Sequence, residues 1–232
     1  MKVKVLTFDC FGTLIDWETG ILRALAMLCE RYGIDEPPSR SELLALYAQL
    51  EAKAEHGEYR PYKDVLADVT KGVAARFGFQ LSLADQTLLA DSIKDWPAFD
   101  DTASSLRELK KHFKLGILSN VDDDLFEGVL PRLGLQSMGG FDVLVTAQQV
   151  ESYKPGHAHF QEALSRLGIE KDELMHVAQS KRHDVAPCNK LGIRCAWVDR
   201  QGGKGGASGE NDARPDIVVP DLASLVGVLL PG

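Results

Sequence analysis

Five polar residues in this chain occupy positions that favour nucleophilic chemistry. Asp9 directly follows the first apolar run, and Ser119 and Asn120 end another. Lys154 follows a third apolar run, and Asp184 follows a fourth. Because the carboxyl ends of parallel strands meet at one edge of a sheet, we expect these side chains to converge on one crevice. Such a set is suited to nucleophilic catalysis by Asp9, with Lys154 holding its charge.

Electrostatics favour an ionised Asp9 in such a crevice. A carboxylate and an ammonium about 4 Å apart attract by about 4 kcal/mol at an effective dielectric constant of about 20. This attraction opposes the desolvation that would otherwise neutralise Asp9. Each residue alone has an ordinary explanation: Asp9 as a turn residue, Lys154 as an exposed lysine, and Asp184 as the N-cap of a helix. The catalytic interpretation depends on their occurring together.

The elements that must position these residues alternate between strand and helix. Val3–Phe8 is β-rich and is expected to form a buried strand. From residue 102 onward helical and strand patterns alternate, which predicts a parallel sheet covered by helices. The expected helices are Thr102–His112, Asp123–Leu133, His159–Leu167 and Val185–Leu191, and the expected strands are Lys114–Ser119, Phe141–Thr146, Met175–Ala178, Arg194–Val198 and Asp216–Val219.

Residues 17–95 have a different pattern. Four helix-forming segments are separated by glycine and proline, and no strand is expected among them. These segments are Ile21–Arg31, Ser41–His56, Tyr62–Phe77 and Leu83–Lys94. The sequence therefore predicts an α/β protein with a Rossmann-like parallel-sheet core, formed by residues 1–16 and 96–232, and an inserted all-helical cap domain, residues 17–95.

Composition narrows the function classes. Twenty-six Lys and Arg against 34 Asp and Glu give a net charge of −8, which argues against binding nucleic acid. No apolar stretch approaches the ~18 residues that cross a membrane, and the start does not resemble a signal peptide, so a cytoplasmic protein is expected. The four cysteines lack CxxC spacing and are expected to be buried thiols, neither zinc ligands nor disulfides.

Four motifs, in order and spacing, resemble those of the haloacid dehalogenase superfamily. They are Asp9-Cys10-Phe11-Gly12-Thr13-Leu14, Ser119-Asn120, Tyr153-Lys154-Pro155, and the segment holding Ser180 and Asp184. The resemblance covers the whole predicted core. It implies a Rossmann-like core with a mobile cap, and an aspartyl ester intermediate on Asp9.

Two residues indicate the branch of this superfamily. Phosphatase members carry a second aspartate where this chain has Phe11, and that acid protonates their leaving group. They also carry an aspartate that helps to hold magnesium where this chain has Gln179. Both differences resemble the type II 2-haloacid dehalogenases, which work without a metal or another cofactor and expel halide from carbon. We therefore expect a small-molecule substrate and no metal, and the resemblance makes a homodimer plausible.

The resemblance also implies roles for individual residues. Asp9 would attack carbon 2 of a short 2-substituted carboxylate, inverting it, and water oriented by Asp184 beside Lys154 would cleave the resulting ester. Hydrogen bonds to the Asp9 carboxylate or to the substrate would come from Thr13, Ser119 and Asn120. The remaining expected substrate-binding residues in the core are Cys10, Phe11, Gln179 and Ser180.

Several positions depart from the dehalogenase pattern. The cap arginine that helps to receive halide in well-known members is missing from Leu46–Gln49, and Arg60, flanked by Tyr59 and Pro61, is the best alternative. Lys181 stands where those members have Asn; it is either another cation in the site or a solvent-facing residue.

Alternative functions follow from these departures. The same nucleophile could open another small carboxylate, as in azetidine-2-carboxylate hydrolases. A magnesium-dependent phosphatase of the same superfamily is a second alternative, disfavoured by Phe11 and Gln179. A catalytically silent binding protein is a third, and the intact set of polar residues argues against it.

Overall fold

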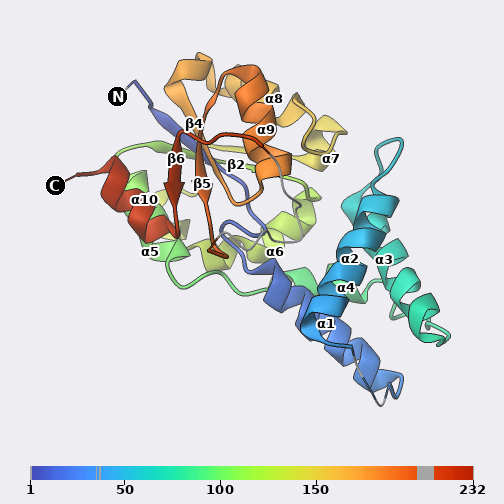
Figure 1. Ribbon diagram of the computed structural model, residues 1–232. Helices are drawn as coiled ribbons and strands as arrows, with labels where there is room; N and C mark the ends of the chain where they lie inside the picture. Colours follow the sequence, from blue (N-terminus) through green and yellow to red (C-terminus); the bar gives the residue numbers. More distant parts are fainter. Residues whose placement is uncertain (1, 35, 37, 203–211, 232) are drawn as a thin grey trace.

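Six parallel strands form one sheet at the centre of the α/β part of the molecule, on the left in Figure 1. The computed structural model describes residues 2–34, 36, 38–202 and 212–231. The strand order is β3-β2-β1-β4-β5-β6, and every neighbouring pair is parallel. The strands are β1 Val5–Phe8, β2 Lys114–Ser119, β3 Val143–Thr146, β4 Leu174–Ala178, β5 Arg194–Val198 and β6 Ile217–Val219. The carboxyl ends of the neighbouring strands β1, β2 and β4 carry Asp9, Ser119 and Gln179, as the sequence predicts.

Helices cover both faces of the sheet, because βαβ crossovers place a helix against each pair of parallel strands. Helices α8 and α9 pack on one face, and α5 and α10 lie on the other (Figure 1). The bounds are α5 Thr102–Lys110, α6 Asp123–Leu133, α7 Ala147–Val150, α8 Ala158–Leu167, α9 Ala186–Leu191 and α10 Leu222–Leu229. The predicted α/β class with a parallel sheet is therefore confirmed.

The segment between β1 and α5 is helical throughout its regular elements and stands beside the sheet in Figure 1. Its helices are α1 Trp17–Arg31, α2 Arg40–Ala54, α3 Tyr62–Phe77 and α4 Leu88–Ser92, followed by a 3₁₀ turn at Ile93–Asp95. A capping box of Ser39 and Glu42 starts α2. Gly78, with φ of 73°, ends α3 in the left-handed conformation that glycine adopts without strain.

The last of these helices begins later than predicted. We expect a helix from Leu83, but α4 starts at Leu88 because Asp85 organises a turn before it. The buried Asp85 carboxylate accepts hydrogen bonds from the Tyr32 and Ser82 hydroxyls and pairs with Arg31. Leu83 itself is exposed. The hydrogen bonds and the ion pair of the buried Asp85 carboxylate therefore stabilise a turn here more than the helix propensity of these residues stabilises a helix.

Several contacts join the helical segment to the core. The chain leaves and returns side by side, with Asp16 N–H donating to the Pro97 carbonyl at 2.8 Å. On α1, Gly20 lies so close to Trp96 that a Cβ there would come within 2.3 Å of the indole. The core residue Asp122 caps α3, because its carboxylate accepts from the backbone N–H groups of Tyr62 and Lys63 at 2.9 Å each. These contacts hold α2 and α3 opposite the carboxyl edge of the sheet.

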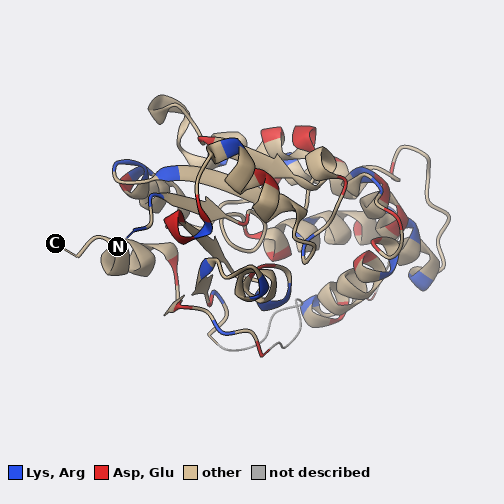
Figure 2. Cartoon of the chain, turned by 90° about the horizontal axis from the view of Figure 1, so that it is seen from above, with Lys and Arg blue, Asp and Glu red and all other residues tan. Residues whose placement is uncertain are grey.

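Lys and Arg positions are interspersed with Asp and Glu positions along the ribbon in Figure 2. This distribution agrees with the net charge of −8. Across the part of the chain that the structure describes, no helix is both long and apolar enough to span a membrane.

Candidate active site

Asp9 lies at the end of β1 with its carboxylate held on both oxygens. Oδ1 is 2.9 Å from Lys154 Nζ, and Oδ2 accepts a hydrogen bond from the Thr13 hydroxyl at 2.9 Å. The chain turns sharply at Gly12, whose φ of 95° is unfavourable for a residue with a side chain. This turn brings Thr13 back over Asp9. The arrangement fixes the carboxylate while leaving lone pairs on both oxygens.

Lys154 uses every hydrogen of its ammonium group within the protein. The three acceptors are Asp9 Oδ1 at 2.9 Å, the Leu118 carbonyl at 2.8 Å and Asp184 Oδ1 at 2.6 Å. The lysine side chain is 1% exposed. Because an ammonium has three donors and all are used, Lys154 supplies charge and position and has no donor left for a ligand.

Asp184 is supported from β4 by a histidine. His176 Nε2 lies 3.0 Å from Asp184 Oδ1, and its Nδ1 lies 2.9 Å from the Thr7 hydroxyl. With the hydrogen on Nε2, the ring donates to Asp184 and accepts from Thr7. Oδ2 of Asp184 is buried and has no hydrogen-bond partner in the described structure. One oxygen of this carboxylate is therefore available to a water or a ligand.

The loops around Asp9 support one another. The Thr13 hydroxyl accepts the backbone N–H of Gln179 at 3.0 Å, and Trp197 Nε1 donates to the Gln179 carbonyl at 2.7 Å. Asn120 holds the Lys154 backbone with two hydrogen bonds: its amide nitrogen donates to the Lys154 carbonyl, and its oxygen accepts the Lys154 N–H. Asn120 thus positions the lysine.

Ser119 is buried at the end of β2, and its hydroxyl has no partner among the described residues. Its carbonyl lies 3.2 Å from His159 Nε2 beneath the site. Burial, together with the Lys154 ammonium, lowers the pKa of His159 to about 3, so this ring is neutral. A buried hydroxyl without a partner is costly, and a ligand in the site would satisfy it.

The charges of the three central residues follow from burial and mutual attraction. Burial raises the pKa of Asp9, although the Lys154 ammonium opposes this. Burial acts in the same direction on Asp184, but Lys154 and His176 outweigh it and bring the pKa of Asp184 below its usual range. For Lys154, the two carboxylates outweigh burial and raise the pKa. The result is a cation shared between an ionised Asp184 and a poorly solvated Asp9.

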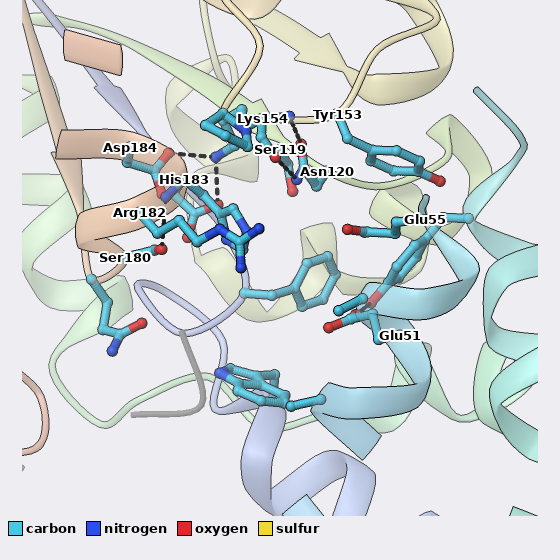
Figure 3. A pocket seen from close by; sticks show the side chains of 18 of the residues that line it. Glu51, Glu55, Ser119, Asn120, Tyr153, Lys154, Ser180, Arg182, His183 and Asp184 are labelled. Atoms are coloured by element: carbon cyan, nitrogen blue, oxygen red, sulfur yellow. Dashed lines mark hydrogen bonds and ion pairs between the residues drawn. The ribbon is translucent and has the colours of Figure 1, made fainter. Parts of the chain in front are cut away.

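A cavity of about 320 Å³ opens between this cluster and the helices α1–α3 (Figure 3). Its core wall contains polar residues from the ends of β1, β2 and β4, and its other wall comes from the helical segment. The lining residues are Asp9, Phe11, Trp17, Ala48, Glu51, Ala52, Glu55, His56, Tyr62, Trp96, Ser119, Asn120, Tyr153, Lys154, Pro155, Gln179, Ser180, Arg182, His183 and Asp184.

The structure brings most of the expected site residues to this cavity. Of those outside the lining, Thr13 touches Asp9, and Cys10 is fully buried with its carbonyl accepting the N–H groups of Leu14 and Ile15. Cys10 therefore shapes the loop and does not face a ligand. Ser180 lines the cavity and its hydroxyl also accepts the His183 N–H.

Arg60 does not lie where we expect it. Its guanidinium is exposed and pairs with Asp68 on α3 at 2.8 Å, outside the cavity lining. Only the backbone carbonyl of Arg60 contacts a residue of the site. It accepts a hydrogen bond at 2.8 Å from the hydroxyl of Tyr153, which lines the cavity. Lys181 also lies outside the lining, with its ammonium 4.0 Å from the centre of the Trp197 ring.

Comparison with known proteins identifies the family. The model of the family described as haloacid dehalogenase-like hydrolase matches residues 6–198. The chain belongs to this family. An (S)-2-haloacid dehalogenase of Pseudomonas fluorescens is 30% identical over 230 residues, covering 97% of this chain and 95% of the relative. A validoxylamine A 7′-phosphate phosphatase of Streptomyces hygroscopicus subsp. limoneus is 26% identical over 227 residues, covering 96% and 95%.

Among solved structures, one similar fold is an L-2-haloacid dehalogenase from Xanthobacter autotrophicus with chloropropionic acid covalently bound. Its TM-score is 0.77 at 22% identity, and the match covers 99% of this chain and all of the other. The whole chain, helical segment included, therefore shares the fold of haloacid dehalogenase-like hydrolases.

The donor set of this haloacid dehalogenase-like hydrolase fits a metal poorly. One carboxylate oxygen of Asp9 and one of Asp184 each accept a hydrogen bond from Lys154. A third carboxylate is missing, because the residue at that position is the neutral amide Gln179. Among the residues described, no group of three or more His, Cys, Asp or Glu side chains is arranged to hold a metal ion. Magnesium prefers several oxygen ligands of this kind, so the residues present do not fit it.

Four of the residues that the sequence analysis did not expect at the site bear on its chemistry. His176 could have been found because it is a polar residue in the predicted strand that ends beside the site. Arg182 lies between Ser180 and Asp184, yet only the π-helical turn Lys181–Val185 places it on the cavity. Glu51 and Glu55 face the cavity from the end of α2, and their four-residue spacing was the available signal.

Proposed function

We propose that this chain is a metal-independent hydrolase of short 2-substituted carboxylates, converting a 2-haloalkanoate to the 2-hydroxyalkanoate and halide. The observation that carries the proposal is the desolvated Asp9 carboxylate, held by Lys154 and Thr13 and facing a cavity. Phe11 provides no proton donor beside it, which suits halide because this leaving group needs no proton. The names of the (S)-2-haloacid dehalogenase relatives support the same reaction.

In the first step one oxygen of Asp9 attacks carbon 2 of the substrate. The carbon–halogen bond breaks, its electron pair leaves with the halide, and an ester forms between Asp9 and carbon 2 with inversion. Lys154 remains charged throughout and keeps Asp9 ionised before attack. Burial of the carboxylate removes the water that would weaken it as a nucleophile.

In the second step water attacks the ester carbonyl carbon of Asp9. Asp184 Oδ2, the oxygen without a partner, accepts a hydrogen from that water and orients it. The bond between the ester carbonyl carbon and the alkoxy oxygen then breaks, and the alkoxy oxygen takes a proton that came from the water. This releases the 2-hydroxyalkanoate and regenerates Asp9. One proton is released overall with the halide.

The anionic parts of the substrate need donors that Lys154 cannot provide. The free hydroxyl of Ser119 and the guanidinium of Arg182 line the cavity, and no described residue forms an ion pair with Arg182. We assign Arg182 the role of receiving negative charge on the substrate or halide, in place of the cap arginine of well-known dehalogenases. Arg60, paired with Asp68 outside the cavity, is not proposed for this role.

Two alternative reactions compete with this proposal. The same site could open a ring such as that of azetidine-2-carboxylate, because that reaction needs the same attack on carbon 2. A magnesium-dependent phosphatase is favoured by the validoxylamine A 7′-phosphate phosphatase relative and opposed by Phe11 and Gln179.

The domain boundaries, the compartment and the oligomeric state are also part of the proposal. We place the core at residues 1–16 and 96–232 and the cap at 17–95, since the chain crosses between them beside Asp16 and Pro97. We also propose a cytoplasmic homodimer. The four free, buried cysteines support a reducing compartment, and the dimer follows from the resemblance to the dehalogenase branch.

Halide release tests this function. The substrates are chloro-, bromo- and fluoroacetate and both enantiomers of 2-chloropropionate, with EDTA present and Asp9→Asn as the control. We expect halide release that survives EDTA and disappears in the variant. Release of phosphate from phosphomonoesters only when magnesium is added would overturn the proposal in favour of the phosphatase.

A further inference from the structure

The cap wall of the cavity is acidic. Glu51, in the last turn of α2, and Glu55, just after it, are four residues apart and lie on one side of the helix. Both line the cavity, and Figure 3 shows them across it from Lys154 and Asp184. Carboxyl groups offer a halide no positive charge in either protonation state, so this wall is not built to receive the leaving group.

Glu51 is held firmly in its place. The hydroxyls of Tyr47 and Tyr62, both buried, donate to the same oxygen, Glu51 Oε1, at 2.7 and 2.6 Å. No described residue donates to Oε2. Two rigid aromatic donors thus fix one oxygen of the carboxylate and leave the other for a partner.

Neither glutamate has a cation of its own. No lysine or arginine of the described chain forms an ion pair with Glu51 or Glu55, and Arg182 acts on Glu55 only at longer range. Burial and the neighbouring Glu51 raise the pKa of Glu55 to about 8, and burial also raises the pKa of Glu51. Without a cation nearby, Glu55 is therefore mostly protonated at pH 7, and a cation that enters the cavity favours the ionised form of both carboxyl groups.

The opposite wall independently indicates a polar ligand. The Ser119 hydroxyl, in a residue that is 0% exposed, and Asp184 Oδ2 line the same cavity and have no partner among the described residues. A buried hydroxyl left unsatisfied indicates that a ligand completes the site. A molecule that satisfies Ser119 at one end can meet Glu51 and Glu55 at the other.

We propose that the substrate carries a cationic nitrogen on its carbon chain beyond carbon 2, bound by the carboxylates of Glu51 and Glu55. This inference deepens the proposed function and rests on it for the reaction at carbon 2. The substrate class is a 2-substituted alkanoate with an ammonium or similar group at the far end. The ammonium donates a hydrogen bond to Glu51 Oε2, and its positive charge offsets the negative charge of the two carboxylates.

Three 2-chloro acids of matched length test the proposal: 2-chloro-6-ammoniohexanoate, 2-chloroheptanoate and 2-chlorohexanedioate. Shorter ammonium homologues establish the optimal length. We expect kcat/KM for the best ammonium substrate to exceed that of its neutral counterpart at least about 10-fold, equivalent to about 1.4 kcal/mol. The dicarboxylate should be the poorest substrate. At pH 7 an alkyl ammonium is charged, since its pKa is about 10.4.

The Glu51→Gln/Glu55→Gln double variant should lose this preference while still releasing halide from the neutral acid. Glutamine keeps an oxygen for the tyrosine hydroxyls, and a thermal melt checks that the variant folds. Glu58→Gln is the matched control, because Glu58 is exposed and outside the cavity lining. An equal or greater preference for the neutral acid in the wild type would overturn the proposal.

Calorimetric binding of the corresponding 2-hydroxy acids to the wild type separates this inference from the reaction. Tighter binding of the ammonium acid than of the neutral acid, without any halide release, would uphold the cation site and refute the dehalogenase reaction. Halide release from all three chloro acids without a preference would uphold the reaction and refute the cation site. Equal binding together with no release would refute both.

Discussion

Replacing Thr13 with valine removes two hydrogen bonds from the loop that holds Asp9. The Thr13 hydroxyl donates to Asp9 Oδ2 at 2.9 Å and accepts the Gln179 N–H at 3.0 Å, and the residue is fully buried. Valine has nearly the same shape but can form neither bond. Thr13→Ser is the matched control, because serine keeps the hydroxyl and loses only a methyl group.

The two variants should differ in free energy of unfolding. A hydrogen bond to a charged group contributes about 1.5–3 kcal/mol, and a buried N–H left without an acceptor costs about 1–3 kcal/mol. Because the Gln179 N–H is only partly buried, the lower value applies to it. We therefore expect Thr13→Val to lose about 3 kcal/mol, and Thr13→Ser about 1 kcal/mol for the deleted methyl group.

Activity should separate the variants further. Asp9 loses one of its two anchors in Thr13→Val, and a misplaced nucleophile lowers the rate by about 100-fold. Urea unfolding gives the stability, and halide release from 2-chloropropionate gives kcat/KM. If Thr13→Val matches Thr13→Ser in both measurements, Thr13 does not hold Asp9 and our reasoning about this loop is refuted.

Further predictions concern charge at the site. Lys154→Met should abolish halide release and lower the free energy of unfolding by about 3–5 kcal/mol, because it leaves buried carboxylates without their cation; unchanged activity would contradict this role. Arg182→Ala should raise KM for chloroacetate about 10-fold, with Arg182→Lys intermediate and Arg60→Ala unchanged as the control outside the cavity. The pKa of Glu55 is raised from 4.5 to about 8 in the folded protein. The free energy of unfolding therefore falls as the pH rises from about 4.5 to about 8. Glu55→Gln should therefore raise Tm at pH 9 relative to wild type but not at pH 4, and a Tm gain independent of pH would contradict the burial of this carboxyl.

Much of the fold was predictable because its signals are local. The apolar strands end in Asp9 and Ser119, and a buried parallel strand requires no partner information to be recognised. The later start of α4 was not predictable, because the turn depends on a hydrogen bond between Asp85 and Tyr32, which follows the end of α1 far away in the sequence. The helix α10, Leu222–Leu229, was also missed, since Pro220 and Asp221 interrupt the apolar pattern just before it.

The core wall of the site was predictable for the same reason, since each residue sits at a strand end. The cap wall was not. Arg60, between a tyrosine and a proline, gave a plausible local pattern, yet Asp68 two turns away on α3 holds its guanidinium outside the cavity. Conversely, Glu51 appears in sequence as an ordinary surface residue of a helix, and only the folded tyrosines Tyr47 and Tyr62 show that its carboxylate is held in place.

Labelled water tests the central role of Asp9 most directly. A single turnover of 2-chloropropionate, with the enzyme in excess in water labelled with oxygen-18, distinguishes an aspartyl ester from direct attack by water. We predict that mass spectrometry finds the label in the side chain of Asp9 and unlabelled oxygen in the hydroxyl of the product. Label in the product hydroxyl after that single turnover, with Asp9 unlabelled, would contradict the ester mechanism.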